Sequence, residues 1–432
     1  MKISDIANIL NAEFNGVDRE IYGFSVDSRT IKENELFIAL KGKNFNGEDF
    51  VLDALNRGAV GAIVSKSFNK DTKQIIIVEE PLNALIQISK FYRENSLKNT
   101  KIVAVGGASG KTTTKEMLYT IFSKLYKTYK SPKSFNNNIG LPLTILNTKE
   151  DAEFLIIEIG TNHKGEVESL VDIAKPQYAI ITNIGPEHLE FFENIDDVAE
   201  EEISIFKYSK VGFMRKEDYE NYKKHLKDKT IITFDLNDYK YEFLEVGVRL
   251  YFDSYSVDFL NYGWLENAIG VFKVANFFNI EEPYKLLENF KSEAMRMEII
   301  NLDKFQIIND AYNANPLSVK ALFYSIKPSK KNVFILGDML ELGKFSEFYH
   351  REIAKYILNL GHSRVILLGE LVRYTYEELK GKIECYYFRE KEKLFNFLRY
   401  YITGNERVIL KASRGMKFEE ILDFIKGLIE NT

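Results

Sequence analysis

The stretch 102-IVAVGGASGKTTTKEM-117 contains residue types that suit the binding of phosphate groups. Gly107 and Gly110 lack side chains, so the backbone N–H groups of this loop can approach phosphate oxygens closely. Lys111 supplies a cation for terminal phosphates, and Thr112 supplies a hydroxyl for Mg²⁺. An apolar run precedes the loop and a helical pattern follows it, and a helix start adds partial positive charge.

The loop departs from the eight-residue phosphate-loop pattern, because Val105 stands where the first glycine would be. The shorter pattern GxxGKT does fit from Gly107 to Thr112. A glycine-rich turn that only caps a helix is the alternative interpretation. We predict a nucleotide-binding segment made of Gly107, Ala108, Ser109, Gly110, Lys111, Thr112 and Thr113.

Two polar residues follow other apolar runs that read as buried strands. Glu158 ends the run FLIIE, and His188 follows IITNIG at a short distance. Ligands of open parallel sheets gather at the carboxyl ends of strands, and a buried carboxylate needs a partner. We therefore predict that Glu158 and His188 bind metal or phosphate. The alternatives are a salt-bridged core glutamate and a packing histidine.

The stretch 196-DDVAEEEISIF-206 gathers five acidic residues before an apolar run. Acidic residues at a helix start are stabilised by the helix dipole, so a solvated first turn is the simplest interpretation. We expect this of Asp196, Asp197, Glu200 and Glu201. Glu202 is considered again below.

These residues require strands and helices that hold them in place. Apolar runs alternate with helical patterns along the whole chain, which is typical of α/β domains with parallel sheets covered on both faces. A chain of 432 residues exceeds one core. We predict three α/β domains, 1–97, 98–297 and 298–432: a small first domain, a central phosphate-loop ATPase-type sheet and a Rossmann-like third domain.

Composition excludes several classes of protein. The net charge of -5 gives no electrostatic basis for binding nucleic acid. The single cysteine, Cys385, allows neither an intrachain disulfide nor a cysteine zinc site, and we expect it to be a small buried residue. No signal peptide or apolar run long enough to span a membrane is visible, so the cytoplasm is the expected location.

Motifs along nearly the whole chain resemble those of the Mur ligases, ATP-dependent amide-forming enzymes of cell-wall precursor synthesis. The similar segments are 26-VDSRTIKENELFIALKGKNFNGEDF-50, GGASGKTTTKE, 134-SFNNNIGLPLTIL-146, 158-EIGTNHKGEV-167, 182-TNIGPEHLE-190, 310-DAYNANP-316, 337-GDMLELG-343 with His350, and 411-KASRGM-416. YNANP with GDMLELG favours the member that adds a dipeptide over the one that adds the third amino acid.

The resemblance implies an ADP-forming ligase that joins D-alanyl-D-alanine to UDP-N-acetylmuramoyl-tripeptide through an acyl phosphate. It implies ATP and Mg²⁺ as cofactors. The first domain would bind the uridine nucleotide, the central domain ATP, and the third domain would close on ATP and bind the dipeptide. The expected partners are small molecules only, and the expected protein is a monomer.

The resemblance also implies roles for individual residues. Lys111, Thr112, Glu158 and His188 would hold the triphosphate and the first Mg²⁺, with Asn136 and Asn137 lining the same site. Arg296 and Asp310 would grip the nucleotide. The dipeptide would be surrounded by Asn313, Asn315, Asp338, Glu341, Ser413 and Arg414, and the uridine nucleotide would contact Ser28 and Arg29. Turn formation, helix capping and surface ion pairs are alternatives for residues of the last two groups.

Three departures from the family pattern stand out. The family's carbamylated lysine falls on Glu202, and we hypothesise that the Glu202 carboxylate serves a second Mg²⁺ in its place. The adenine-side stretch keeps Asn267, but Gly263 and Trp264 replace its His-Asn, so Trp264 either stacks on adenine or packs in the core. Met295-Arg296 replaces Gly-Arg at the hinge. Residues 207–262 match nothing we can place.

Two other functions remain open at this stage. One is a related ligase acting on another carboxylate, such as an archaeal cofactor-ring ligase or a folylpolyglutamate synthase-like enzyme; residues 1–97 argue against the latter, which lacks a separate uridine-nucleotide domain. The other is a nucleotide switch without catalysis, which the departures at Glu202 and Trp264 would suit.

Overall fold

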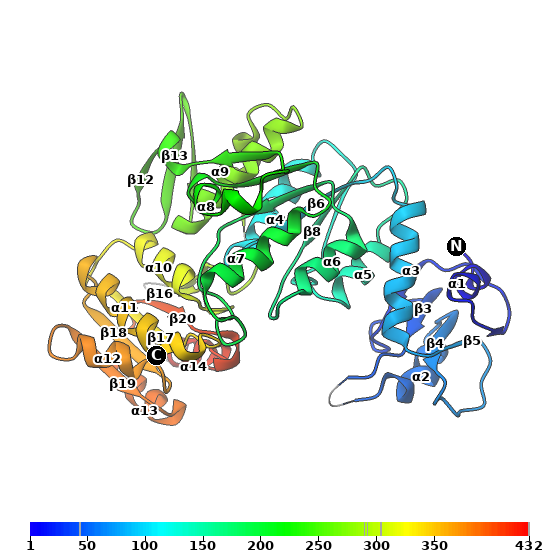
Figure 1. The fold of residues 1–432 in the computed structure, drawn as a ribbon. Coiled ribbons are helices and arrows are strands. Elements are labelled where there is room, and N and C mark those ends of the chain that lie inside the picture. The colour runs from blue at the N-terminus through cyan, green and yellow to red at the C-terminus, as the bar shows by residue number, and fades with distance from the viewer. Residues whose placement is uncertain (43–44, 289, 292, 303–304, 431–432) are drawn as a thin grey trace.

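The computed structural model describes residues 1–42, 45–288, 290–291, 293–302 and 305–430. It has three α/β lobes in chain order, with the first and third on opposite sides of the central one (Figure 1). The predicted α/β fold class is confirmed. No described segment forms a helix both long and apolar enough to cross a lipid bilayer.

The first lobe contains a five-stranded sheet in the order β1-β5-β4-β3-β2. All its pairs are parallel except β1 with β5. Its strands are β1 Phe14–Asn15, β2 Gly23–Ser25, β3 Glu35–Ile38, β4 Gly61–Ser65 and β5 Ile75–Val78, and its helices are α1 Ile3–Leu10, α2 Val51–Asn56 and α3 Pro81–Asn95. Pro at the first position of α3 suits a helix start, since its missing N–H is not needed there.

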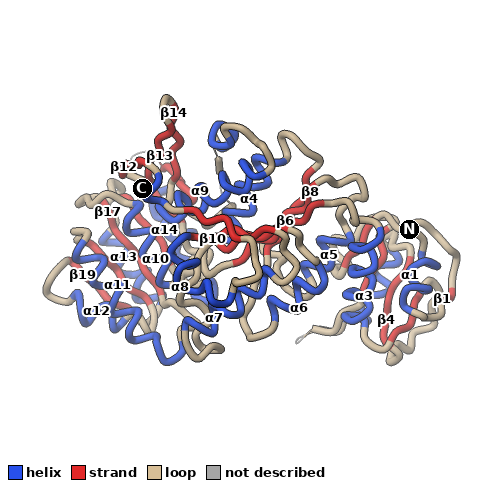
Figure 2. The backbone as a smooth tube through the Cα atoms, turned by 45° about the horizontal axis from the view of Figure 1, so that its top comes forward, coloured by secondary structure: helices blue, strands red, loops and turns tan. Residues whose placement is uncertain are grey.

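The central lobe contains a six-stranded parallel sheet in the order β11-β10-β9-β6-β8-β7. Its strands are β6 Lys101–Gly106, β7 Thr128–Lys130, β8 Phe154–Glu158, β9 Tyr178–Ile181, β10 Val211–Arg215 and β11 Ile231–Phe234. Its helices are α4 Lys111–Phe122, α5 Gly140–Leu146, α6 Glu166–Ala174, α7 Ile195–Ile203, α8 Lys216–Tyr222 and α9 Tyr262–Phe277. Helices α4 and α9 cover one face, and α6 and α7 the other (Figure 2).

Residues 207–262, which the sequence left unassigned, complete the central sheet and add a small antiparallel one. Strands β10 and β11 extend the parallel sheet, whereas β12 Lys240–Phe243, β13 Val248–Phe252 and β14 Tyr255–Phe259 form the separate three-stranded sheet. All four residues of β12 are exposed, so this sheet lacks the apolar runs that mark buried strands.

The third lobe contains a six-stranded sheet in the order β15-β16-β20-β17-β18-β19, parallel except for β15 with β16. Its strands are β15 Glu298–Leu302, β16 Phe305–Asn309, β17 Asn332–Gly337, β18 Arg364–Leu368, β19 Glu384–Phe388 and β20 Arg407–Lys411. Its helices are α10 Pro316–Ser325, α11 Ser346–Asn359, α12 Arg373–Leu379, α13 Lys391–Tyr401 and α14 Glu419–Glu430. Cys385 on β19 is only half-buried, and burial raises the pKa of its thiol to about 12.

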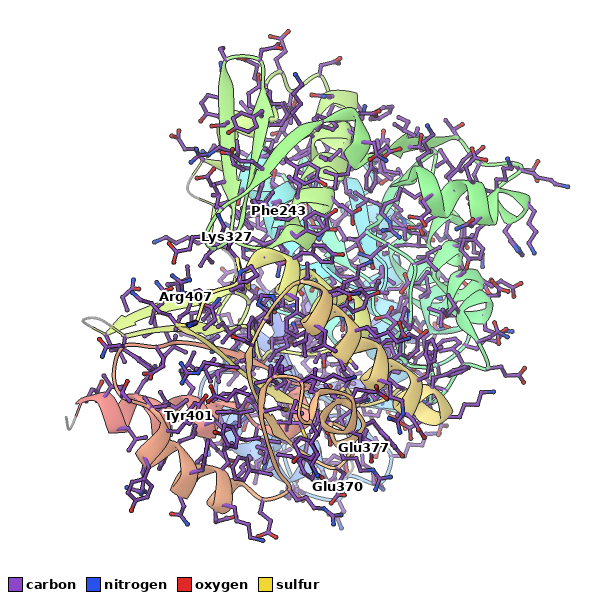
Figure 3. The ribbon with its side chains drawn as sticks, turned by 90° about the vertical axis from the view of Figure 1, so that its left-hand side faces the viewer. Phe243, Lys327, Glu370, Glu377, Tyr401 and Arg407 are labelled. Carbon is purple, nitrogen blue, oxygen red and sulfur yellow. The ribbon has the colours of Figure 1, made fainter. Side chains whose placement is uncertain are left out.

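A three-residue attachment joins the small antiparallel sheet to the third lobe. Val246 forms a β-bridge with Ile326. The Gly247 N–H donates to the Ser325 carbonyl at 2.6 Å, and the Arg407 guanidinium pairs with Glu245 at 2.7 Å. We call residues 245–247 with their partners the strap; Figure 3 shows Phe243, Lys327 and Arg407 along this boundary.

Candidate active site

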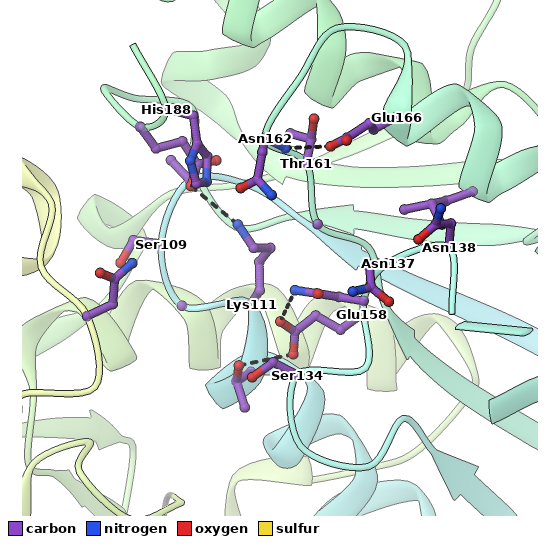
Figure 4. Close-up of a pocket in the computed structure, with 18 of the residues that line it drawn as sticks. Ser109, Lys111, Ser134, Asn137, Asn138, Glu158, Thr161, Asn162, Glu166 and His188 are labelled. Atoms are coloured by element: carbon purple, nitrogen blue, oxygen red, sulfur yellow. Dashed lines mark hydrogen bonds and ion pairs between the residues drawn. The ribbon is translucent and has the colours of Figure 1, made fainter. Parts of the chain in front are cut away.

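A cleft with a volume of about 1150 Å³ opens at the carboxyl ends of the central strands. The phosphate loop, the 134–138 loop and the start of α6 line it from the central lobe (Figure 4). The connection between the central and third lobes contributes Arg296, and the third lobe contributes Asp310, Tyr312, Asn313, Asn315 and Lys411. Ile86 and Lys90 of α3 line it from the first lobe, so the site depends on how all three lobes meet.

The phosphate loop requires glycine at two positions. Gly107 and Gly110 have φ angles of +112° and +88°, in the region that side chains disfavour. A Cβ atom at Gly107 would lie 2.8 Å from the Asn183 carbonyl oxygen, and one at Gly110 would lie 2.1 Å from Asn267 Nδ2. The Ser109 N–H donates to Asn183 Oδ1 at 2.9 Å, which fixes the loop against the end of β9.

Lys111 lies at the start of α4, where its ammonium is surrounded by acceptors. Lys111 Nζ donates to the Gly107 carbonyl at 2.6 Å and lies 3.4 Å from Glu187 Oε2. Burial disfavours the charged ammonium, but Glu187, Glu202 and Glu158 outweigh this effect and raise the pKa of Lys111. The side chain is therefore charged and ready to exchange these acceptors for phosphate oxygens.

Thr112 and Glu158 present oxygen atoms to the cleft side by side. The Thr112 hydroxyl donates to Glu158 Oε2 at 3.0 Å, and Asn136 Nδ2 donates to Glu158 Oε1 at 3.0 Å. Mg²⁺ takes hard oxygen ligands, usually one or two from protein with the rest from phosphate and water. No group of three or more His, Cys, Asp or Glu side chains suited to a metal occurs among the described residues. The Thr112–Glu158 pair fits a magnesium ion that arrives with a nucleotide.

Asn137 contacts the next helix. Its Oδ1 accepts from the Gly140 N–H at 2.9 Å and so holds the start of α5. Asn137 lines the cleft, as predicted, beside Asn136.

The third lobe reaches this pair through Arg296. One Arg296 guanidinium nitrogen donates to Thr112 Oγ1 at 3.0 Å, and the guanidinium lies over the Tyr312 ring at 4.0 Å from its centroid. Asp310 pairs with Lys411 at 2.6 Å and also accepts from the Met297 N–H at 3.1 Å. The structure thus brings Arg296 and Asp310 to the phosphate loop.

His188 and Glu341 form a second contact between the central and third lobes. His188 Nδ1 lies 2.7 Å from Glu341 Oε2, and this bond holds the pKa of Glu341 below its usual value despite some burial. Both residues have left-handed backbones, with φ angles of +51° and +62°. Here His188, predicted as a metal or phosphate ligand, contacts a residue predicted to bind the dipeptide.

The residues predicted to surround a dipeptide are not all in the cleft. Asn313 and Asn315 line it, and Asn315 also caps α10 and donates to the Ala108 carbonyl at 3.1 Å. Glu341 lies at the lobe boundary described above. Asp338, Ser413 and Arg414 do not line it.

Asp338 and Ser413 are buried and hold backbone segments of the third lobe. The Asp338 carboxylate accepts from the N–H groups of Glu370, Leu371 and Val372 at 3.0, 2.9 and 2.8 Å. Ser413 Oγ accepts from the Leu340 N–H at 2.9 Å. Their geometry favours the capping interpretation, and a direct ligand contact stays a prediction. Arg414 is exposed and pairs with Glu419 at 3.2 Å.

His350 holds the backbone of the GDMLELG segment, residues 337–343, in place. It is 1% exposed; its Nε2 accepts from the Met339 N–H at 3.1 Å, and its Nδ1 lies 2.7 Å from the Ser346 carbonyl. Burial lowers the pKa of this imidazole, so it is neutral.

Glu202 lies directly beneath the phosphate loop. It is fully buried, and its Oε2 accepts from the Gly107 N–H at 2.6 Å. Burial is the main cause that raises the pKa of Glu202 to about 8, and neighbouring Glu187 adds to it while Lys111 opposes it. Glu202 does not line the cleft, and its predicted role at a second Mg²⁺ stays untested.

The expectation for Glu201 is wrong. Glu201 is 5% exposed, and its carboxylate accepts from the N–H groups of Gly165 and Val167 at 2.7 Å each. It caps the start of α6 and is not solvated. Asp196 and Glu200 are exposed and Asp197 is half-exposed, as a solvated first turn requires.

A smaller pocket of about 240 Å³ continues from the phosphate loop toward α9. Asn267 and Trp264 line it together with Tyr262. Trp264 is 7% exposed and its ring packs against Phe290 at 6.0 Å, so it belongs mainly to the core. Asn267 is 3% exposed and lies against Gly110; its contact with a nucleotide stays a prediction.

Ser28 and Arg29 lie in the first lobe, apart from the large cleft. Ser28 is buried, whereas the Arg29 guanidinium is exposed and pairs with Asp27 at 2.7 Å. Their contact with a uridine nucleotide stays a prediction.

Sequence reasoning missed three residues of the site. Glu187, in the quoted motif TNIGPEHLE, contacts Lys111. The ring of Tyr312, within DAYNANP, packs against the Arg296 guanidinium. Lys115 lies one turn after Lys111 and contacts Glu158. All three residues lie inside the motifs quoted above, and this position was the sequence signal that could have identified them.

A phosphate loop with a charged lysine, facing an oxygen-lined cleft between α/β lobes, defines a nucleotide-dependent enzyme. Family models of the Mur ligase catalytic, middle and glutamate ligase domains match residues 20–95, 105–281 and 295–414. The chain belongs to the Mur ligase family, and it is an ATP-dependent amide-forming ligase most like the members named MurF.

Two relatives cover nearly the whole chain. The UDP-N-acetylmuramoyl-tripeptide–D-alanyl-D-alanine ligase of Rickettsia prowazekii is 32% identical over 98% of this chain and 97% of its own. The Bacillus subtilis enzyme of the same name is 33% identical over 95% of this chain and 94% of its own. Among solved structures, MurF ligase from Thermotoga maritima in complex with ADP superposes with a TM-score of 0.82 at 26% identity, covering 95% of this chain and 98% of that one. MurF from Acinetobacter baumannii shares the fold, with a TM-score of 0.83 at 24% identity and coverages of 99% and 98%.

Proposed function

We propose that this ligase joins D-alanyl-D-alanine to UDP-N-acetylmuramoyl-tripeptide, with ATP converted to ADP and phosphate. The observation that carries the proposal is the Lys111, Thr112 and Glu158 constellation at the mouth of a cleft shared with the third lobe. The names of the full-length relatives support the choice of substrates.

The chemistry follows from the groups that face the cleft. The substrate carboxylate attacks the γ-phosphorus, the bond from that phosphorus to the bridging oxygen of ADP breaks, and an acyl phosphate forms. The amine of the dipeptide then attacks the acyl carbon, loses a proton, and phosphate leaves as the tetrahedral intermediate collapses. The protein lowers both barriers by positioning the reactants and by neutralising charge.

Each group has a proposed task in this scheme. Lys111 moves from the Gly107 carbonyl and Glu187 to the phosphates, and the ends of β6 and α4 hold the loop around them. Thr112 and Glu158 would hold Mg²⁺, which neutralises phosphate charge. Arg296 already reaches Thr112 and adds a third cation next to the transferred group.

The domain roles are proposed from the same layout. Residues 1–97 would hold the uridine nucleotide, 98–297 would hold ATP, and 298–432 would close on ATP and bring the dipeptide. We further propose that the enzyme acts as a monomer in the cytoplasm and supplies peptidoglycan precursor, on which cell shape and division depend.

Coupled ADP release tests this function. ADP should form only when ATP, UDP-N-acetylmuramoyl-tripeptide and D-alanyl-D-alanine are all present with Mg²⁺. Lys111→Ala should lower kcat at least about a hundredfold, because the transferred phosphoryl group loses its main cation. Lys98→Ala, at an exposed turn before β6, is the control and should leave the rate unchanged. ATP hydrolysis indifferent to both other substrates would contradict the proposal.

A further inference from the structure

Lys115 is a fully buried ammonium that the proposed mechanism does not use. It is 0% exposed and absent from the lining of the cleft, although it follows Lys111 by one helical turn. A buried charge is costly unless partners compensate it, so the contacts of Lys115 indicate what it holds.

Three acceptors surround Lys115 Nζ. It lies 3.7 Å from Glu158 Oε2 and 3.5 Å from Glu116 Oε1, and it donates to the Lys133 carbonyl. Glu116 in turn pairs with Lys130. Charges of alternating sign therefore lead from the half-buried Lys130 inward to the carboxylate proposed to bind Mg²⁺.

The bond to Lys133 ties the same ammonium to a second part of the site. Lys133 has a left-handed backbone, with a φ angle of +46°, at the start of the loop that carries Asn136. Asn136 in turn donates to Glu158 Oε1. Lys115 thus contacts one oxygen of the Glu158 carboxylate and also holds the loop that carries Asn136. The Asn136 side-chain amide bonds the other carboxylate oxygen of Glu158.

We propose that Lys115 is a positioning residue that orients Glu158 and neutralises it, so that the site binds a divalent cation well only together with nucleotide phosphates. The proposal rests on the assignment of Glu158 to the metal in the proposed function. A cation 3.7 Å from the carboxylate repels a divalent ion by Coulomb's law, and the added negative charge of a triphosphate overcomes that repulsion.

Binding of Mn²⁺ alone to the full-length protein tests this, because it requires no turnover. Free Mn²⁺ is counted by electron paramagnetic resonance during titration without nucleotide. Lys115→Met keeps the aliphatic stem and removes the charge, so Mn²⁺ should bind about tenfold more tightly than to the wild type. In Glu116→Gln, Glu158 is the only carboxylate among the described residues left beside Lys115, so Lys115 neutralises it more completely. Mn²⁺ should therefore bind more weakly than to the wild type.

The double variant Lys115→Met/Glu116→Gln removes one charge of each sign and guards against a folding failure of the single variant. It should also bind Mn²⁺ more tightly than the wild type, whereas Lys98→Met should bind as the wild type does. In turnover, Lys115→Met should lose about 10- to 100-fold in kcat with the KM for ATP little changed, because Glu158 and its loop are no longer fixed.

The outcomes separate this inference from the ligase proposal. Unchanged or weaker Mn²⁺ binding by both the folded single and double variants overturns the role of Lys115, whatever the substrates. The expected Mn²⁺ pattern without any ligase activity would retain the role of Lys115 and refute the proposed substrates.

Discussion

Glu202 combines complete burial with a bond to the loop it supports. A carboxylic acid and a carboxylate would both accept from the Gly107 N–H, but only the carboxylate could serve a cation. The raised pKa, about 8, favours the acid at neutral pH in the absence of ligands. A metal at this position would have to displace that proton.

Glu202→Gln is expected to flatten the pH dependence of stability. The folded protein retains the Glu202 proton up to a pKa of about 8, whereas the unfolded chain releases it near the ordinary glutamate pKa of 4.5. Because the native state binds the extra proton in this window, the free energy of unfolding falls as pH rises from about 4.5 to 8. Urea unfolding across that range should show a smaller fall for Glu202→Gln, which carries no titrating proton.

The same variant tests the second-metal hypothesis. If the free energy of unfolding fell equally with pH for Glu202→Gln and the wild type, the titration of Glu202 in this range would be refuted. Loss of activity with an unaltered KM for ATP would instead support a carboxylate that serves the transferred group. Full activity would assign Glu202 to support of the loop alone.

Residue types together with the family resemblance predicted several of the side chains that meet at the cleft, but not which carboxylates serve the backbone. Lys111, Glu158 and Arg296 lie together because phosphate chemistry requires them in recognisable motifs. Glu201 could not be assigned from its neighbours in sequence, since its partners Gly165 and Val167 belong to a helix start some 35 residues away.

At the scale of elements, buried parallel strands were predictable and the small antiparallel sheet was not. Strands β6, β8 and β9 are covered on both faces, so they read as continuous apolar runs between glycine-containing turns. Strands β12 to β14 have exposed faces and give no such run. Residues 207–262 also contain the parallel strands β10 and β11, which are only partly buried and which the sequence did not reveal either.

The loop after β18 depends on one buried carboxylate, that of Asp338. Asp338→Ala leaves three backbone N–H groups of residues 370–372 without their acceptor, so we expect a loss of about 3 kcal/mol in the free energy of unfolding. Urea unfolding measures this. Asp338→Asn should lose less, since its amide oxygen still accepts.

Ligand binding distinguishes this role of Asp338 from the dipeptide contact predicted from sequence. If Asp338 only holds the loop, Asp338→Asn should raise the KM for D-alanyl-D-alanine little. A large rise in that KM with normal stability would contradict the structural role.

At the scale of the whole molecule, the central and third lobes meet through apolar packing of α9 against α10 and through polar contacts near the cleft. Glu341→Gln replaces the carboxylate that lies against His188, so the distance between the central and third lobes should become more variable. Spin labels on exposed sites of the two lobes, measured by pulsed electron resonance without nucleotide, report that distribution. The matched control is Glu347→Gln, which removes a pair with Arg351 inside the third lobe. An unaltered distribution for Glu341→Gln would show that other contacts set the separation.

The strap gives the third lobe a second attachment besides the covalent connection near Met295 and Met297, whose φ angles are +61° and +52°. If the polar contacts at the cleft open, these two attachments favour rotation about the line that joins them. Arg296 sits at one end of this axis and would be displaced little by such rotation. Glu370 and Glu377, labelled away from the strap in Figure 3, would move farther than Arg296 in such a rotation.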